Sequence, residues 1–289
     1  MKDARALQIG FVGAGRVAGG LSLALHAAGF SIAAVSSRSH DSAKAVADLT
    51  GCAAFENAQD IADQCDLVFI TTPDGLIAEA TSAITWRAGQ AAVHCSGATE
   101  VSALSNAAKA GALIGGFHPM QSFGAPATSA KALTGSTITI EADDPLDGVL
   151  TALVTGLGCR INRLPAGKRA LYHASAGYGS QFVNVLLAET AALWRNWGAS
   201  EEDVVRAIMP MIRGTLDAIE KGGIAGGMPG PVSRGDEQTV AAHIKALKEM
   251  NGEHLALYRA HCSRTVDLAE EAERIDESTA QRLRKLLDE

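Results

Sequence analysis

The chain has 289 residues and a formal net charge of −7, with 25 Lys and Arg residues against 32 Asp and Glu residues. Its hydrophobic content of 47% is enough to build a large core and excludes an intrinsically disordered chain. The acidic balance and the aromatic content of 4% argue against a nucleic-acid-binding protein, which would show a basic surplus or base-stacking side chains.

The cysteines, the histidines and the apolar runs indicate the cellular compartment and whether a metal site or a membrane segment is expected. There are five cysteines with no CxxC pair, which is typical of a reducing cytoplasm rather than of a disulfide framework. The eight histidines form no HExxH motif, so no metal site is expected. No signal core and no apolar stretch of about 18 residues is present, which predicts a cytoplasmic protein without a membrane partner.

The first part of the chain alternates short apolar runs with amphipathic stretches, the pattern of βαβ units. The predicted strands are 8–12, 31–36, 53–55, 67–71, 91–95, 112–117, 137–141 and 159–164. The helical patterns between them are 17–28, 42–50, 58–64, 75–84, 101–110 and 145–157. This order predicts a doubly wound, mostly parallel α/β sheet of the Rossmann type, covered by helices on both faces.

After residue 165 the pattern becomes helical. Residues 168–197 predict one long helix, and Ser200 with the acids that follow it predicts the start of a second. Pro210 should kink that helix and Gly222–Gly223 should end it. A Gly/Pro-rich loop and at least two more helices complete the chain. Two domains are therefore expected, an α/β domain over 1–165 and an all-helical one over 166–289.

A glycine-rich turn follows the first predicted strand and opens a helix. It reads GxGxxA, in which Gly13 allows a tight turn, Gly15 leaves room for a pyrophosphate, and Ala18 lets the helix pack close to the strand. The free N–H groups and the dipole of the helix N-terminus suit phosphates. The predicted dinucleotide cradle is Gly13, Ala14, Gly15, Arg16 and Val17.

The second predicted strand ends in Ser36, Ser37 and Arg38, where an NAD site would usually place an acid on the ribose 2′-hydroxyl. A guanidinium can hold a 2′-phosphate and the serines can donate to it, so NADP is the favoured cofactor. The alternative is that Arg38 is a solvated loop charge. Thr72 and Pro73 follow the fourth strand, either as cofactor contacts or as its terminator.

Two further strand ends carry polar side chains, Ser96 after the fifth strand and His118 after the sixth. Ligands of a doubly wound sheet lie outside the carboxyl ends of its strands, so both are candidate catalytic residues. An imidazole near its ordinary pKa of about 6.5 suits a proton donor at neutral pH. The alternative for His118 is a turn residue before proline.

The helical part supplies the remaining candidates. Tyr172 and His173 lie near the start of the long predicted helix, where it leaves the cofactor domain. Tyr172 is a candidate substrate contact, and His173 is either catalytic or structural. Arg234 lies in the Gly/Pro-rich loop and is a candidate clamp for a substrate carboxylate, or else a partner of Asp236.

The segments GFVGAGRVA, FHPMQSF, LYHASA and GPVSRGD resemble bacterial Rossmann-like proteins with a DUF2520 C-terminal domain. That group is similar to pyrroline-5-carboxylate reductases and F420-dependent NADP oxidoreductases. The resemblance implies an NADP-binding domain followed by a helical substrate and dimerisation domain, and hence a homodimer through the helices. The chain departs from this pattern at Gly179-Ser180-Gln181, where the group has an asparagine shortly after the Tyr-His pair.

The serine and the His-Pro at successive strand ends are also similar to those of prephenate dehydrogenases. That resemblance implies catalytic roles for Ser96 and His118.

The leading hypothesis is an NADP-dependent oxidoreductase that transfers hydride to or from a C=O or C=N of a small, carboxylate-bearing metabolite. Two alternatives remain open, namely a non-catalytic NADP(H)-sensing protein and an NADPH:deazaflavin oxidoreductase.

Overall fold

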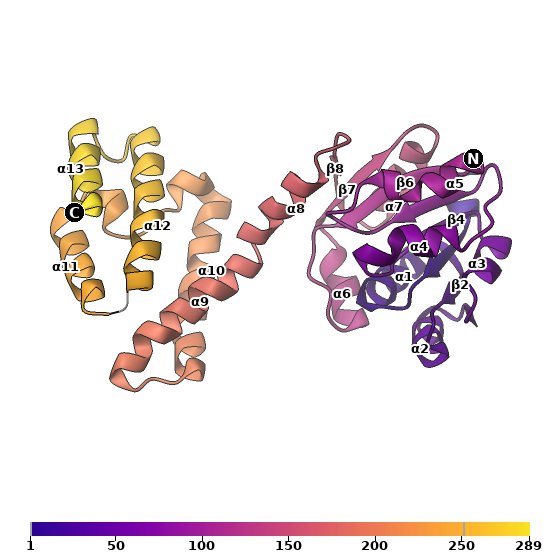
Figure 1. Cartoon of the computed structure of the whole chain (residues 1–289), viewed down its shortest axis with the longest axis horizontal. Coiled ribbons are helices and arrows are strands. Elements are labelled where there is room, and N and C mark those ends of the chain that lie inside the picture. Colours follow the sequence, from indigo (N-terminus) through magenta and orange to yellow (C-terminus); the bar gives the residue numbers. More distant parts are fainter. Residues whose placement is uncertain (1, 251) are drawn as a thin grey trace. The chain divides into compact units, whose positions relative to one another are not determined.

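The structure is a computed structural model and describes residues 2–250 and 252–289 (Figure 1). The contacts within the chain divide it into two compact units, one ending at Gly179 and the other running from Ser180 to Glu289. Each unit is described by itself below.

The first unit is built on an eight-stranded sheet with the order β3-β2-β1-β4-β5-β6-β7-β8. Neighbouring strands are parallel except β6 and β7, which are antiparallel, so the predicted mostly parallel sheet is confirmed. The strands are β1 (Gln8–Val12), β2 (Ser31–Ser36), β3 (Ala53–Phe55), β4 (Leu67–Ile70), β5 (Ala91–His94), β6 (Leu113–Pro119), β7 (Thr137–Ala142) and β8 (Arg160–Arg163).

The helices of this unit are α1 (Arg16–Ala27), α2 (His40–Thr50), α3 (Ala58–Gln64), α4 (Ile77–Ser82), α5 (Ser105–Lys109), α6 (Pro126–Leu133), α7 (Leu146–Gly156) and α8 (Arg169–Tyr178). There are also three short 3₁₀ turns, η1 (Ala4–Ala6), η2 (Asp74–Leu76) and η3 (Val101–Leu104). The last two occupy the starts of the predicted helices 75–84 and 101–110. Helix α6 was not predicted from the sequence. Its proline at the first position is compatible with a helix start, and it packs on two glycines of α1.

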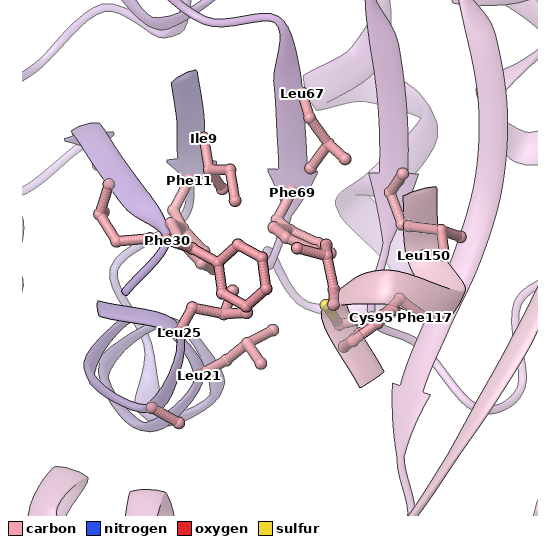
Figure 2. Close-up of a cluster of buried hydrophobic side chains, with 14 of the residues drawn as sticks. Ile9, Phe11, Leu21, Leu25, Phe30, Leu67, Phe69, Cys95, Phe117 and Leu150 are labelled. Atoms are coloured by element: carbon pink, nitrogen blue, oxygen red, sulfur yellow. The ribbon is translucent and has the colours of Figure 1, made fainter. Parts of the chain in front are cut away.

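Alternation along the strands gives the sheet two buried faces. On β1, Ile9 and Phe11 belong to a core with side chains of α1 and α7, while Val12 belongs to a second core with side chains of α3 and α5. Figure 2 shows the first core, in which Phe11 stacks on Phe69 at 5.2 Å between ring centroids and Phe69 meets Phe117 edge-on at 5.4 Å. Burial on both faces explains why these strands are nearly continuous apolar runs.

The predicted long helix over 168–197 is wrong, because two helices occupy it. Helix α8 ends at Tyr178 and α9 (Gln181–Trp194) begins at Gln181, with Ser180 at φ −131° and ψ −85° between them. Glycine and serine are poor helix formers, and they interrupt the apolar repeat here. The division after Gly179 falls one helix later than the boundary expected at 165, because α8 is anchored in the first unit by the buried Arg169.

The second unit is helical. After α9 come η4 (Arg195–Trp197), α10 (Glu201–Gly226), η5 (Val232–Arg234), α11 (Glu237–Lys248), α12 (Gly252–Glu271) and α13 (Glu277–Asp288). Its core contains Val240, Ile244, Val266 and Leu283, from the last three helices. Within residues 2–250 and 252–289, none of the helices has the length and hydropathy needed to cross a membrane.

The start of α10 and its break near Gly222–Gly223 agree with the sequence prediction. Ser200 and Asp203 form a reciprocal capping box at its N-terminus. Pro210, where a kink was predicted, lies inside the helix, and the backbone leaves helical geometry only at Gly223, with φ 74° and ψ 175°. A positive φ favours glycine, so the predicted stop at Gly222–Gly223 has a physical reason.

The contact between α1 and α6 yields a stability prediction. A Cβ added at Gly20 would lie 2.8 Å from the Cβ of Ser129 and 2.9 Å from the ring of Phe123. We expect Gly20→Ala to lower the free energy of unfolding by about 1–3 kcal/mol, since overpacking outweighs the gain in helix propensity. Chemical denaturation measures this change.

Gly148→Ala in α7 is the matched control, because a Cβ there meets nothing within 4 Å. It should raise the free energy of unfolding by up to about 1 kcal/mol through helix propensity alone. Equal effects of the two substitutions would contradict the packing explanation.

Candidate functional site

A cavity of about 430 Å³ lies at the carboxyl ends of β1, β2 and β4. The sequence-predicted cofactor residues that line it are Gly13, Ala14, Gly15, Ser36, Ser37, Arg38, Thr72 and Pro73. Arg16 and Val17 are not among the lining residues, and they form the first turn of α1 directly after the glycines. The structure therefore brings the three predicted cofactor segments together around one space.

The glycine turn has the shape that a phosphate cradle requires. Gly13 has φ +102°, and a Cβ there would lie 2.8 Å from the backbone of Thr71 and Thr72. Its N–H donates to the Ser36 carbonyl at 2.8 Å, and its own carbonyl accepts from Thr71 Oγ1 at 2.7 Å. By contrast, a Cβ at Gly15 would meet nothing within 4 Å. Open space therefore lies over the N-terminus of α1, where a pyrophosphate would be bound by N–H groups.

Arg38 lies exposed on the rim of this cavity, and among the described residues it forms no salt bridge. Ser42 and Glu56, which were not predicted from the sequence, line the same cavity. Glu56 directly follows β3, and its position after a strand is the signal that could have identified it. Its carboxylate lies 3.9 Å from His40 Nδ1. This rim thus offers one guanidinium and one carboxylate to a nucleotide.

The opposite wall contains a polar atom without a partner. Thr72 Oγ1 is buried and makes no hydrogen bond within the described part of the chain. Buried hydroxyls are usually satisfied, so an unpaired one in the wall of a cavity is what a bound ligand would complete. The open cradle at Gly15, Arg38 on the rim and this hydroxyl all fit a dinucleotide.

Two further predicted residues, Ser96 and His118, lie at the ends of β5 and β6, on the same edge of the sheet. Ser96 is buried, and its hydroxyl accepts from the N–H groups of Ala98 and Thr99 at 3.1 and 2.9 Å. It also lies 3.0 Å from Thr99 Oγ1. These bonds hold the turn after β5 in place, and the catalytic role of Ser96 stays a prediction.

His118 and His173 converge over Gly97. Their ring centroids are 6.3 Å apart, and a Cβ at Gly97 would lie 2.8 Å from both His118 Nε2 and His173 Cδ2. Only glycine leaves room for two imidazoles here. His173 is exposed, whereas His118 is partly buried.

The environment of His118 differs from the one expected. Burial lowers the pKa of its imidazole to about 4, and the nearby His173 and Arg169 act in the same direction, with Asp74 opposing them. The expectation of an imidazole near pKa 6.5 is therefore wrong, and the ring is neutral at pH 7. A neutral ring can still donate a hydrogen bond to a substrate.

Arg169 is an important residue that the sequence analysis missed. Its fully buried guanidinium donates from Nε to Glu141 Oε2 at 2.6 Å and from Nη1 to the Ser96 carbonyl at 2.7 Å. A Cβ at Gly116 would overlap with it. An arginine placed four residues before His173 in a predicted helix was the available signal, but its burial depends on tertiary packing.

Tyr172, predicted to contact substrate, is 8% exposed, and its hydroxyl lies 2.7 Å from His118 Nδ1. Arg234 lies exposed in η5 of the second unit, so its role as a carboxylate clamp stays a prediction. The Asp236 carboxylate next to it caps α11 through the Thr239 N–H at 3.0 Å. Among the described residues, no group of three or more His, Cys, Asp or Glu is arranged to hold a metal ion.

Solved structures share this fold across nearly the whole chain. A protein from Thermotoga maritima is 24% identical, with a TM-score of 0.74 over 92% of this chain and 99% of that one. An imine reductase from Pseudomonas sp. is 18% identical, with a TM-score of 0.58 over 98% and 92%. The pyrroline carboxylate reductase of Plasmodium falciparum, solved with NADP bound, is 11% identical, with a TM-score of 0.61 over 98% of each chain. At these identities the likeness shows the fold.

No curated protein matches the chain by sequence. Two family models do match. The model of the Rossmann-like domain matches residues 1–119, which hold the cavity, Ser96 after β5 and His118 on β6. The model of a domain of unknown function, DUF2520, matches residues 136–265. The chain thus combines a Rossmann-like domain with a DUF2520 domain, in that order along the sequence.

Proposed function

We propose that the protein is an NADP-dependent oxidoreductase that acts on a C=O or C=N bond of a small, carboxylate-bearing metabolite. One observation carries this proposal. The cradle at Gly13 and Gly15 and the paired imidazoles over Gly97 lie at the same edge of one sheet. Asp74, next to the cavity-lining Pro73, is close enough to His118 to affect its pKa.

Each part of the edge has a task in this proposal. A nicotinamide cofactor bound at the glycine cradle would supply the hydride for the carbon of the C=O or C=N. The π electrons of that bond would move to the heteroatom, which would take its proton from solvent. His118 and His173 hydrogen-bond the heteroatom as its charge develops, which is the kind of stabilisation that contributes most to many enzymatic rates. Ser96 holds the turn that carries Gly97.

The comparisons support the same class of reaction. Among the similar structures are an imine reductase, a pyrroline carboxylate reductase with NADP bound, and a reductive aminase from Aspergillus terreus in complex with NADPH. Each of these proteins is named as a reductase or a reductive enzyme, and two of them were solved with NADP or NADPH bound. They favour an imine or a carbonyl as the reacting group here.

We further propose a cytoplasmic homodimer formed through the helical unit. Helix α9 exposes Phe182, Val185 and Leu186, which are 39%, 48% and 44% exposed, and a second copy of the chain would cover such a surface. The unpaired cysteines, both buried and partly exposed, suit a reducing compartment.

Cofactor choice is tested at Arg38. If its guanidinium binds the 2′-phosphate, Arg38→Ala should weaken NADPH binding by about 10- to 100-fold, the value of one or two charge-assisted hydrogen bonds. NADH binding should change much less. Isothermal titration calorimetry measures both affinities, and Arg160→Ala, which removes an exposed arginine on β8, is the matched control. Failure of the wild-type protein to bind either form of NADP would refute the proposal.

Catalysis is tested at His118. NADPH consumption is measured with a panel of small keto acids and cyclic imino acids, and the best substrate is then used with His118→Asn. We expect turnover to fall by about 10²–10³-fold, as for the loss of a single donor to a developing anion. His243→Asn is the control, because His243 also bonds a tyrosine but lies on α11. Unchanged turnover in His118→Asn would remove His118 from the mechanism.

The assembly is tested by light scattering after gel filtration. We expect twice the chain mass of 29.8 kDa for the wild type and a monomer for Leu186→Arg, since a charge cannot be buried without a partner. Leu268→Arg, which changes a 39% exposed leucine on α12, should stay dimeric. A monomeric wild-type protein would contradict the proposed assembly.

A further inference from the structure

The register of the last three strands places three polar side chains in one row. His118 on β6 is paired with Thr139 on β7, and Thr139 is paired with Asn162 on β8. Their neighbours Phe117, Ile138 and Ile161 point into the core of the first sheet face. The row therefore lies on the opposite face, where α8 carries Tyr172.

Hydrogen bonds join this row to the helix. Asn162 Nδ2 donates to Thr139 Oγ1 at 3.0 Å. Burial raises the pKa of the Tyr172 phenol, and the neighbouring Thr139 acts in the opposite direction. The Tyr172 hydroxyl lies 2.7 Å from His118 Nδ1. The Tyr172 and His118 rings meet edge-on at 88° with centroids 5.5 Å apart. Four side chains from three strands and one helix thus lie next to one another in a series that ends on the imidazole, with hydrogen bonds at its first and last steps.

The direction of the protons follows from which groups can donate. The Asn162 amide nitrogen can only donate, so the Thr139 hydroxyl oxygen accepts from it. The proton of the Thr139 hydroxyl is then donated to a different acceptor. Thr139 is fully buried, so water does not accept that proton, and the neighbouring Tyr172 oxygen is the acceptor that we assign to it. The Tyr172 proton is then directed to His118 Nδ1. In this arrangement each hydroxyl proton in the chain has an acceptor.

We propose that the chain Asn162–Thr139–Tyr172 fixes the tautomer of His118, with Nδ1 as acceptor and the ring proton on Nε2, facing Gly97. Tyr172 is then a positioning residue that acts on substrate through His118. This inference rests on the proposed function for its catalytic meaning, because the Nε2 proton is the one offered to the reacting heteroatom.

The amide of Asn162 determines which tautomer results. If its oxygen faced Thr139, Thr139 would donate to it, Tyr172 would donate to Thr139, and His118 Nδ1 would have to carry the proton. His118 Nε2 would then be an acceptor and could not stabilise a developing anion. The two directions of this hydrogen-bond series therefore make His118 Nε2 either a donor or an acceptor at the site, and a measurement can distinguish them.

The test is long-range ¹H–¹⁵N correlation NMR of the cofactor-free, ¹⁵N-labelled full chain at pH 7. The protonated and unprotonated nitrogens of a neutral imidazole give separate signals, and those of His118 are assigned by their loss in His118→Asn. We expect the Nε2-protonated form in the wild type. Finding the Nδ1-protonated form there would overturn the proposal without any variant.

Two substitutions test the series of hydrogen bonds from Asn162 to His118. Asn162→Asp places a group that only accepts next to Thr139, so the chain should reverse and the Nδ1-protonated form of His118 should predominate. Tyr172→Phe removes the donor to Nδ1 and should change the tautomer ratio of His118 by about tenfold, the equivalent of one hydrogen bond. A His118 spectrum that neither substitution changes would contradict the proposal.

Tyr258→Phe is the matched control. Tyr258 bonds His243 Nδ1 at 3.0 Å in the second unit, with a similar edge-on geometry. Its removal should alter the signals of His243 and leave those of His118 unchanged. Because these spectra are recorded without cofactor, the two outcomes are distinguishable. A failure of NADPH binding would refute the proposed function, whereas a wrong tautomer would refute this inference and the donor role of His118 but would leave NADPH binding unchanged.

Discussion

The candidate site depends on one buried ion pair, between Arg169 on α8 and Glu141 on β7. The guanidinium is wholly inside the protein, and it also holds the Ser96 carbonyl at the end of β5. In other proteins, removing one partner of such a pair costs about 3–5 kcal/mol because an uncompensated charge remains buried. The pair thus joins a helix, an antiparallel strand and the turn of Gly97, and it brings Tyr172 and His173 to the sheet edge.

The spacing of residues on α8 agrees with the pleat of the strands below it. Arg169 and Tyr172 are three residues apart on one side of the helix, while Gly116 and His118 on β6 are two apart on one side of the strand. Each helix side chain therefore lies over one strand position, the guanidinium over Gly116 and the phenol over His118. The same positive charge helps to lower the pKa of His118, so Arg169 both positions the helix over the strand and keeps the imidazole neutral.

Much of this architecture can be predicted from the sequence, because strands buried on both faces and a GxGxxA turn are local patterns. The glycine cradle and the serines and arginine after β2 were placed around one cavity as expected. What could not be predicted depends on contacts between distant segments. The break at Gly179–Ser180 was concealed by an apolar repeat on both sides, and the burial of Arg169 requires a glycine more than fifty positions earlier. The pKa of His118 likewise depends on neighbours from other elements.

The absence of a side chain at Gly116 has a consequence for how this sequence can diverge. A guanidinium at position 169 and a methyl group at position 116 cannot occupy the same space, so position 116 cannot gain a side chain while residue 169 remains an arginine. An alanine at 116 is compatible only with a shorter residue at 169, and that change would leave the Glu141 carboxylate without its counter-ion. Positions 116, 141 and 169 should therefore change together among homologous chains, as a covarying triplet.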